Sequence, residues 1–180
     1  MSILDPNKLR HELLLEEAIN AQLDKLVGYA TRTALLLDGN TKMKTSQLRN
    51  LLNVALDPAS VEVVINFIRY QIAREGNAWN PKNFGHAVID DIRGPVQQLV
   101  STSISKAREL EGQHLSSQVI DFDAQSYAIY VRLIQLYLGY LQRVFYAYDK
   151  AKSEQKKEAV VQMQAIVDTV FPKTGEGNNG

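Results

Sequence analysis

Residues 122–150 read FDAQSYAIYVRLIQLYLGYLQRVFYAYDK, and this stretch has the clearest helical pattern in the chain. Large apolar and aromatic residues recur there every three or four positions, as they do on one face of an α-helix. They are Tyr127, Tyr130, Val131, Ile134, Tyr137, Leu138, Leu141, Val144, Phe145 and Tyr148. At 1.5 Å per residue, such a helix would be roughly 43 Å long. The pattern predicts one long helix in the C-terminal half of the protein.

The same helical spacing runs through the rest of the chain, and no segment alternates apolar and polar residues as a half-buried strand does. In the first segment the apolar stripe predicts an extended helix that ends at Asp38-Gly39-Asn40. Further helices are expected over residues 45–56, from Pro58 to Ile72, over 84–111 with a kink at Gly94-Pro95, and over 154–170. The expected fold class is all-α, a five- to six-helix bundle with one long helix in its C-terminal half.

Length and composition favour one helical domain. The chain has 180 residues, of which 45% are hydrophobic, and we expect a single bundle over residues 1–172. Residues 173–180 have nothing to bury, so a disordered tail is predicted there. The absence of cysteine excludes disulfides and thiolate zinc sites. With no signal-peptide pattern and no membrane-spanning run, we expect a soluble, cytoplasmic protein without membrane contact.

Basic residues gather around one predicted helix start. The 20 basic and 20 acidic side chains of the chain cancel, but residues 41–110 hold nine basic and six acidic ones. Lys42, Lys44 and Arg49 surround the start at Thr45, which we expect to cap the helix by accepting backbone hydrogen bonds. Backbone amides and the helix dipole would add to the attraction of these cations for phosphate. The alternative is an ordinary cap with solvated lysines.

The long helix carries a second cationic pattern. At 100° per residue, five positions fall within one narrow stripe, which combines three cations, a glycine and a tyrosine. They are Arg132, Gly139, Arg143, Tyr146 and Lys150. A glycine permits close backbone approach, a tyrosine can stack on a base, and arginine suits phosphate. Lys25 and Arg32 flank Tyr29 in a weaker version of this pattern. For both patterns, the alternative interpretation is an ordinary solvated helix face without a ligand.

Residues suited to catalysis do not form a pattern. His11, His86 and His114 lie far apart in the sequence, in no metal-ligand spacing. Asp90 and Asp91 are adjacent on a helix, so their side chains point in different directions and cannot share a proton or a metal. We therefore expect no enzyme activity, no cofactor and no metal site.

Two segments, roughly Thr45 to Arg74 and Tyr130 to Asp149, resemble a known family through three runs of sequence. The run Lys44-Thr45-Ser46-Gln47-Leu48-Arg49, followed one helix later by Tyr70-Gln71-Ile72-Ala73-Arg74, is similar to paired motifs in the small, all-helical subunit of type III CRISPR effector complexes. A later run, Tyr140-Leu141-Gln142-Arg143-Val144-Phe145-Tyr146-Ala147-Tyr148, resembles the C-terminal helix of that family. The likeness is of the III-A or III-D kind. This chain differs in its extended first helix and in a large insertion over residues 76–121.

The resemblance implies a non-catalytic RNA-binding part of a larger ribonucleoprotein in antiviral defence. Such subunits stack in several copies, touch the repeated backbone subunits and the large signature subunit, and contact the guide–target RNA duplex through basic side chains. On this basis Lys44, Arg49, Arg69, Arg74 and Arg143 are candidates for the RNA-facing surface. With the residues taken from the charge patterns, the candidate RNA-binding set is Lys42, Lys44, Arg49, Arg69, Arg74, Arg132, Arg143 and Lys150. The alternative is a helical protein–protein adaptor with no nucleic-acid contact.

Overall fold

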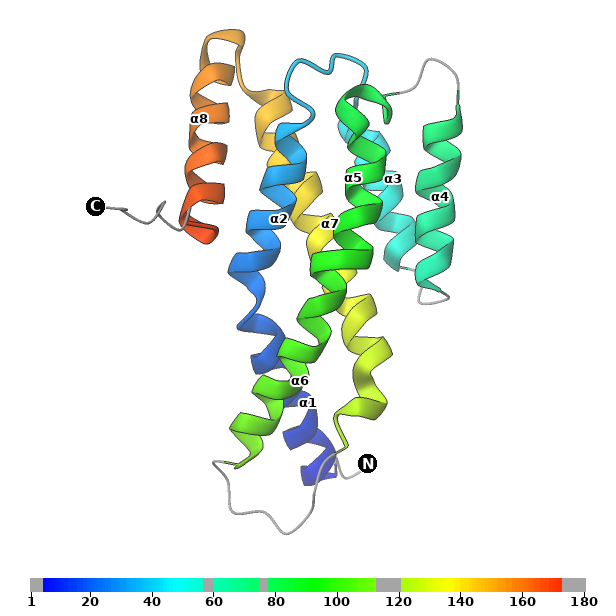
Figure 1. The fold of residues 1–180 in the computed structure, drawn as a ribbon, viewed down its shortest axis with the longest axis vertical. Coiled ribbons are helices and arrows are strands. Elements are labelled where there is room, and N and C mark those ends of the chain that lie inside the picture. The colour runs from blue at the N-terminus through cyan, green and yellow to red at the C-terminus, as the bar shows by residue number, and fades with distance from the viewer. Residues whose placement is uncertain (1–4, 57–59, 75–77, 113–120, 173–180) are drawn as a thin grey trace, which may run out of the picture.

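The computed structural model describes residues 5–56, 60–74, 78–112 and 121–172, and within these ranges every regular element is a helix (Figure 1). The α-helices are α1 (Pro6–Asn20), α2 (Leu23–Leu35), α3 (Thr45–Leu56), α4 (Val61–Ala73), α5 (Phe84–Asp91), α6 (Gln97–Gly112), α7 (Ser126–Lys150) and α8 (Ser153–Val170). A π-helical turn, Ile92–Val96, joins α5 to α6. The all-α class is confirmed. With α5 and α6 counted as one kinked rod, the described chain has seven helices, somewhat more than expected.

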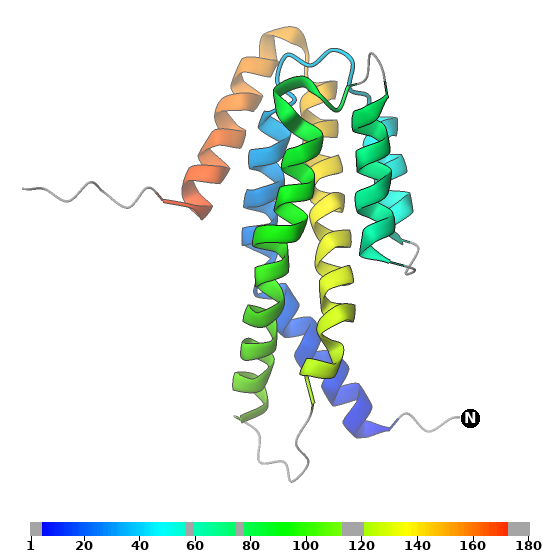
Figure 2. The ribbon, with the colours of Figure 1, turned by 45° about the vertical axis from the view of Figure 1, so that its right-hand side comes forward.

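The predicted long helix is α7, and it lies in the middle of the bundle (Figures 1 and 2). It packs against α2 and α3 over most of its length and against α6 near its start. Most of the predicted apolar stripe faces inward, and Tyr137 and Leu141 are almost fully buried. Tyr127 is 53% exposed, because it lies in the first turn of the helix. The predicted tail, residues 173–180, lies outside the described residues.

The expected continuous first helix is wrong, because the chain turns at Ala21 and Gln22 between α1 and α2. Gln22 is buried at this turn, and its side-chain amide lies 3.5 Å from the Ala18 carbonyl oxygen. The turn lets α1 pack against α6 while α2 packs against α7 (Figure 2). The apolar stripe stays in phase through the turn, with Ile19 and Leu26 both buried. The stripe alone therefore gave no sign of the change in direction.

Helices α3 and α4 agree closely with the sequence pattern. The bounds of α3 match the predicted 45–56, and Leu48, Leu51 and Ala55 are buried. Helix α4 begins at Val61, and the Ser60 hydroxyl caps it by accepting from the Glu62 amide at 3.2 Å. The predicted start at Pro58 lies outside the described residues.

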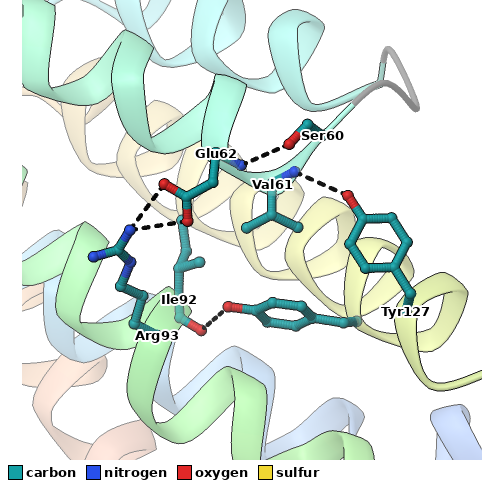
Figure 3. A network of polar contacts seen from close by, with 7 residues as sticks. Ser60, Val61, Glu62, Ile92, Arg93 and Tyr127 are labelled. Atoms are coloured by element: carbon teal, nitrogen blue, oxygen red, sulfur yellow. Dashed lines mark hydrogen bonds and ion pairs between the residues drawn. The ribbon is translucent and has the colours of Figure 1, made fainter.

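The predicted kink at Gly94-Pro95 forms as the π turn between α5 and α6. Because proline has no amide hydrogen, it interrupts the helical hydrogen-bond ladder at this point. The Tyr130 hydroxyl donates to the Ile92 carbonyl at 2.9 Å, and Arg93 pairs with Glu62 of α4 at 2.9 Å (Figure 3). Beside them, the Tyr127 hydroxyl accepts from the Val61 amide (Figure 3). These contacts join the kink to α4 and α7.

A buried carboxylate ties three helices together. Asp91, at the end of α5, is only 5% exposed. It accepts hydrogen bonds from Arg32 of α2 at 2.8 Å, from the Thr33 hydroxyl, and from the Tyr137 hydroxyl of α7 at 2.9 Å. Burial, with the Asp91 charge as a second cause, raises the pKa of Tyr137 well above its usual value. The sequence reading missed this cluster, because it treated Asp90 and Asp91 only as a catalytic pair.

Helix α8 is anchored on α2 through its C-terminal end. A Cβ atom on Gly28 would lie 2.7 Å from Val170, so only glycine permits this close approach. The Phe171 ring stacks on Tyr29 with 4.8 Å between centroids, and the Arg32 guanidinium lies 5.2 Å from the centroid of Tyr29. Arg32 therefore serves the fold, through Asp91 and this aromatic pair.

Tyr137→Phe tests the buried cluster. Removal of the hydroxyl leaves an Asp91 oxygen short of one donor, and the expected loss in free energy of unfolding is about 1–3 kcal/mol. Urea unfolding at constant m-value measures the loss. Tyr146→Phe is the matched control, because Tyr146 is 46% exposed and should unfold like the wild type. Equal midpoints for both variants would contradict the role of the Asp91 cluster.

The raised pKa of Tyr137 also predicts a pH dependence. The unfolded chain ionises this tyrosine near its ordinary pKa of about 10, whereas the folded chain holds the proton to higher pH. The contribution of Tyr137 to stability is therefore complete below about pH 10 and declines as the pH rises further. In urea unfolding across this range, Tyr137→Phe should lose less stability than the wild type. Parallel curves for the two proteins would show that Tyr137 ionises freely in the native state.

Candidate nucleic-acid interface

Helices α3 and α7 lie side by side and run in opposite directions (Figure 1). Two side-chain hydrogen bonds fix their register. At one end the Thr45 hydroxyl donates to the Asp149 carboxylate at 3.2 Å, and further along the Gln135 amide donates to the Ala55 carbonyl at 3.0 Å. The start of α3 is thereby held against the last turn of α7.

This register brings together cations that are about a hundred residues apart in the sequence. Arg49 follows Thr45 by one helical turn, and Tyr146 precedes Asp149 by three residues, so both lie beside the Thr45–Asp149 bond. Arg49 and Tyr146 are exposed. We define the α3–α7 face as Lys44, Arg49, Arg143, Tyr146 and Lys150, all exposed. Four of these five residues belong to the set predicted from the sequence.

The cations of the α3–α7 face are not neutralised by local acids. Arg143 lies 5.5 Å from the ring centroid of Tyr140, and Lys150 lies 5.8 Å from that of Tyr146. Within the described ranges, none of the four cations of the face makes an ion pair. Asp149 lies beside them and accepts from the Thr45 hydroxyl. The face therefore presents positive charge together with an aromatic ring, which suits an anionic polymer.

The start of α3 differs from the prediction, because Thr45 does not cap the helix. Thr45 is the first residue of α3, and its hydroxyl donates to Asp149. A carboxylate is a stronger acceptor than a neutral group, so it competes well for this hydroxyl. The Gln47 side chain instead accepts from the Lys44 amide at 2.8 Å. The threonine thus joins two helices.

Further basic residues extend the positive surface around this end of the bundle. The segments 36–49, 78–83 and 143–158 carry nine basic and four acidic side chains, net +5, and we call this end the positive pole (Figure 1). Lys42 lies there, in a hollow that Lys82 also lines. The Tyr148 hydroxyl donates to Asp38 at 2.7 Å, and burial, followed by this bond, raises the pKa of Tyr148.

Several cations of the positive pole were missed by the sequence reading. They are Lys82, Lys152, Lys156 and Lys157. The Lys156 ammonium lies 5.1 Å from the ring centroid of Tyr148, so α8 contributes charge beside α7. For the last three, the signal was the run of lysines where α7 passes into α8. It is missed when each predicted helix is considered separately.

Arg69 and Arg74 lie apart from the α3–α7 face. Arg69 is exposed on α4, which packs on α3 and α5, and Arg74 is exposed at the residue that follows this helix. The Arg74 guanidinium lies 5.9 Å from the ring centroid of Tyr70 and 3.4 Å from the Gln71 side-chain oxygen. A polyanion bound at the α3–α7 face would have to extend over α4 to contact these two arginines.

Arg132 and Gly139 also differ from the predicted stripe. Arg132 is exposed near the start of α7, where it lines a hollow of about 280 Å³ together with Glu12 and Glu16 of α1. Gly139 is buried, and a Cβ atom there would meet nothing within 4 Å. The stripe is therefore interrupted at its middle, and only its C-terminal half joins the positive pole.

Metal-holding clusters and membrane-spanning helices are absent from the described part of the chain. There, no three histidine, aspartate or glutamate side chains come close enough to hold a metal ion. None of the described helices has the length and apolar character needed to cross a membrane. No protein-family model, curated protein or solved structure matches this chain. The functional proposal therefore rests on the surface of this protein.

Asp149→Asn tests whether the positive pole attracts polyanions locally. Asparagine can still accept from Thr45 but removes one negative charge beside Arg143 and Lys150. The variant should elute from immobilised heparin at a higher salt concentration than the wild type. Glu17→Gln removes the same charge at an exposed position of α1 and should leave the elution salt concentration unchanged. Equal shifts for both variants would mean that the net charge alone governs binding.

Proposed function

We propose that this protein is the non-catalytic small subunit of a type III CRISPR effector complex, of the III-A or III-D kind. In this role it binds the backbone of the guide–target RNA without sequence specificity and bridges neighbouring subunits. The observation that carries the proposal is the Thr45–Asp149 hydrogen bond. It joins the two segments in which the family resemblance lies, and Arg49 and Tyr146 each follow or precede its partners by about one helical turn, which supports a shared surface.

The proposed mechanism is electrostatic. Each arginine or lysine that faces a phosphate displaces a counterion and makes binding salt-dependent, whereas base pairing between guide and target carries the sequence information. The chain as a whole has no net charge, so one copy alone would hold RNA weakly. Several copies along one duplex would add their contacts and retain RNA strongly.

The proposed partners follow from this role. They are the guide and target RNA backbone, the repeated backbone subunits, the large signature subunit and further copies of this protein, in a cytoplasmic ribonucleoprotein. Neither a cofactor nor a metal takes part in the proposal. The α3–α7 face would meet RNA, and the outer surfaces of helices such as α4 and α8 would remain for protein neighbours.

A helical protein–protein adaptor is the second candidate. It is favoured by apolar side chains on the outer surfaces of helices, since Leu13 of α1 is 57% exposed and Val161 of α8 is 67% exposed. Exposed apolar residues on amphipathic helices are typical of docking surfaces. In that case the cations of the α3–α7 face would meet acidic proteins in place of RNA.

Charge reversal in the assembled complex separates the two candidates. Arg49→Glu and Arg143→Glu should each lower target-RNA retention, by about tenfold for an interaction worth roughly 1.4 kcal/mol. Each should also reduce the slope of log affinity against log salt by about one. Lys25→Glu is the control and should retain RNA like the wild type, because Lys25 is exposed on α2 and lies outside both the α3–α7 face and the positive pole. RNA retention that is unchanged in all three variants would favour the adaptor.

A further inference from the structure

The charges of this neutral chain are separated along its long axis. The positive pole lies at the end where α7 passes into α8. The segments 5–17 and 121–123, at the opposite end, carry six acidic and two basic side chains, net −4 (Figure 1). We call this end the negative pole. Two copies placed end to end would therefore bring opposite charges together.

The positive pole includes an apolar groove between α7 and α8. Helix α8 packs mainly on α2 and only slightly on α7, which leaves a groove of about 560 Å³. Its apolar lining includes Val144, Ala147, Ala159, Met163 and Ile166. Alanine side chains allow close approach of another helix.

Lysines lie at one edge of the groove, although its lining holds one cation and one anion. Lys150 lines it, and Lys156 lies over the ring of Tyr148, which also lines it. Glu158 lines it as well, and its carboxylate lies 3.3 Å from the Gln162 amide nitrogen. The groove thus combines an apolar floor with cations at the edge.

Helix α1, at the negative pole, has the opposite chemistry. Leu9 is 44% exposed and Leu13 is 57% exposed, and their spacing of four residues places them on one ridge. Glu12 and Glu16 are exposed and lie beside that ridge. The helix contacts the rest of the bundle mainly through α6, so the ridge has no partner among the described residues.

We propose that α1 of one copy docks in the α7–α8 groove of a second copy. Leu9 and Leu13 meet the apolar floor, while Glu12 and Glu16 face Lys150 and the neighbouring lysines. The two surfaces lie at opposite ends of one molecule, so they cannot pair within a copy, and the contact leaves each end of a dimer open. Head-to-tail rows result.

The inference deepens the proposed function and rests on it for the presence of several copies in one complex. The contact itself is argued from this chain alone. Because it buries few side chains, it is weak in solution and becomes significant when copies are held on one polymer. Of the α3–α7 face, it engages Lys150 and leaves Lys44, Arg49, Arg143 and Tyr146 free to meet RNA.

Disulfide trapping tests the contact in the full chain, which contains no cysteine. A Leu13→Cys preparation is mixed with an Ala147→Cys preparation under oxidation, and the mixed disulfide is followed on non-reducing gels. It should form at least about tenfold faster than the mixed disulfide with Val63→Cys, a 50% exposed control on α4. Equal rates would overturn the proposal. So would faster pairing of Leu13→Cys with itself, which indicates a symmetric contact.

A charge swap provides the second test. Glu12→Lys/Glu16→Lys, added to the Leu13→Cys chain, should slow trapping about tenfold. Lys156→Glu/Lys157→Glu in the Ala147→Cys chain should restore the rate. Failure of the restored pair would show that these charges do not face each other, and the proposed docking would be wrong.

These outcomes are separate from the test of RNA binding. Trapping uses the protein alone, whereas RNA retention is measured in the assembled complex. Specific trapping without an effect of Arg49→Glu or Arg143→Glu on RNA would leave the docking in place and remove the proposed function. Loss of RNA in those variants without specific trapping would support the proposed function and overturn the docking.

Discussion

The bundle depends on the burial of one carboxylate. Asp91 is inside the protein, where an unpaired charge would cost several kcal/mol. Its oxygens therefore need hydrogen-bond donors, and each buried group left without a partner would cost about 1–3 kcal/mol. The donors come from Arg32 and Thr33 on α2 and from Tyr137 on α7. Asp91 immediately precedes the π turn, so the same cluster also sets where the kinked rod crosses its neighbours. The positions of α2, α5 and α7 are therefore linked.

Hydroxyl-to-carboxylate bonds recur toward the positive pole. Tyr148 donates to Asp38, and Thr45 donates to Asp149. Each bond joins segments far apart in the chain and satisfies a carboxylate through a neutral donor. Asp38 and Asp149 therefore hold the scaffold, and within the described ranges neither carboxylate pairs with a nearby lysine or arginine. As a result, the surface that carries Arg49 and Arg143 keeps its positive charge.

Much of the fold could be predicted because burial follows the helical repeat. The inward faces of α3 and α7 came from that repeat, and the predicted bounds of α3 also used the expected helix start at Thr45 and the break before Pro58. Polar residues carry no such signal. Asp90 is exposed and Asp91 is buried, and nothing in their adjacency shows which one meets Arg32, 59 residues away. The same limit applied to Thr45, whose hydroxyl pairs with a carboxylate 104 residues away. It also applied to Arg132, which shares its stripe with Arg143 yet lies near the acids of α1.

Net charge is a poor guide to what this chain binds. The whole sequence sums to zero, which argues against a free-standing nucleic-acid binder. The fold, however, gathers positive and negative segments at opposite ends of the bundle. The 25 residues of α7, at 1.5 Å each, set the distance between these ends at about 38 Å. That separation exceeds the Debye length of about 8 Å at physiological salt. A polyanion near Arg143 therefore responds to the positive pole and is screened from the acids of α1. Within one copy, the two ends therefore act as electrostatically independent surfaces.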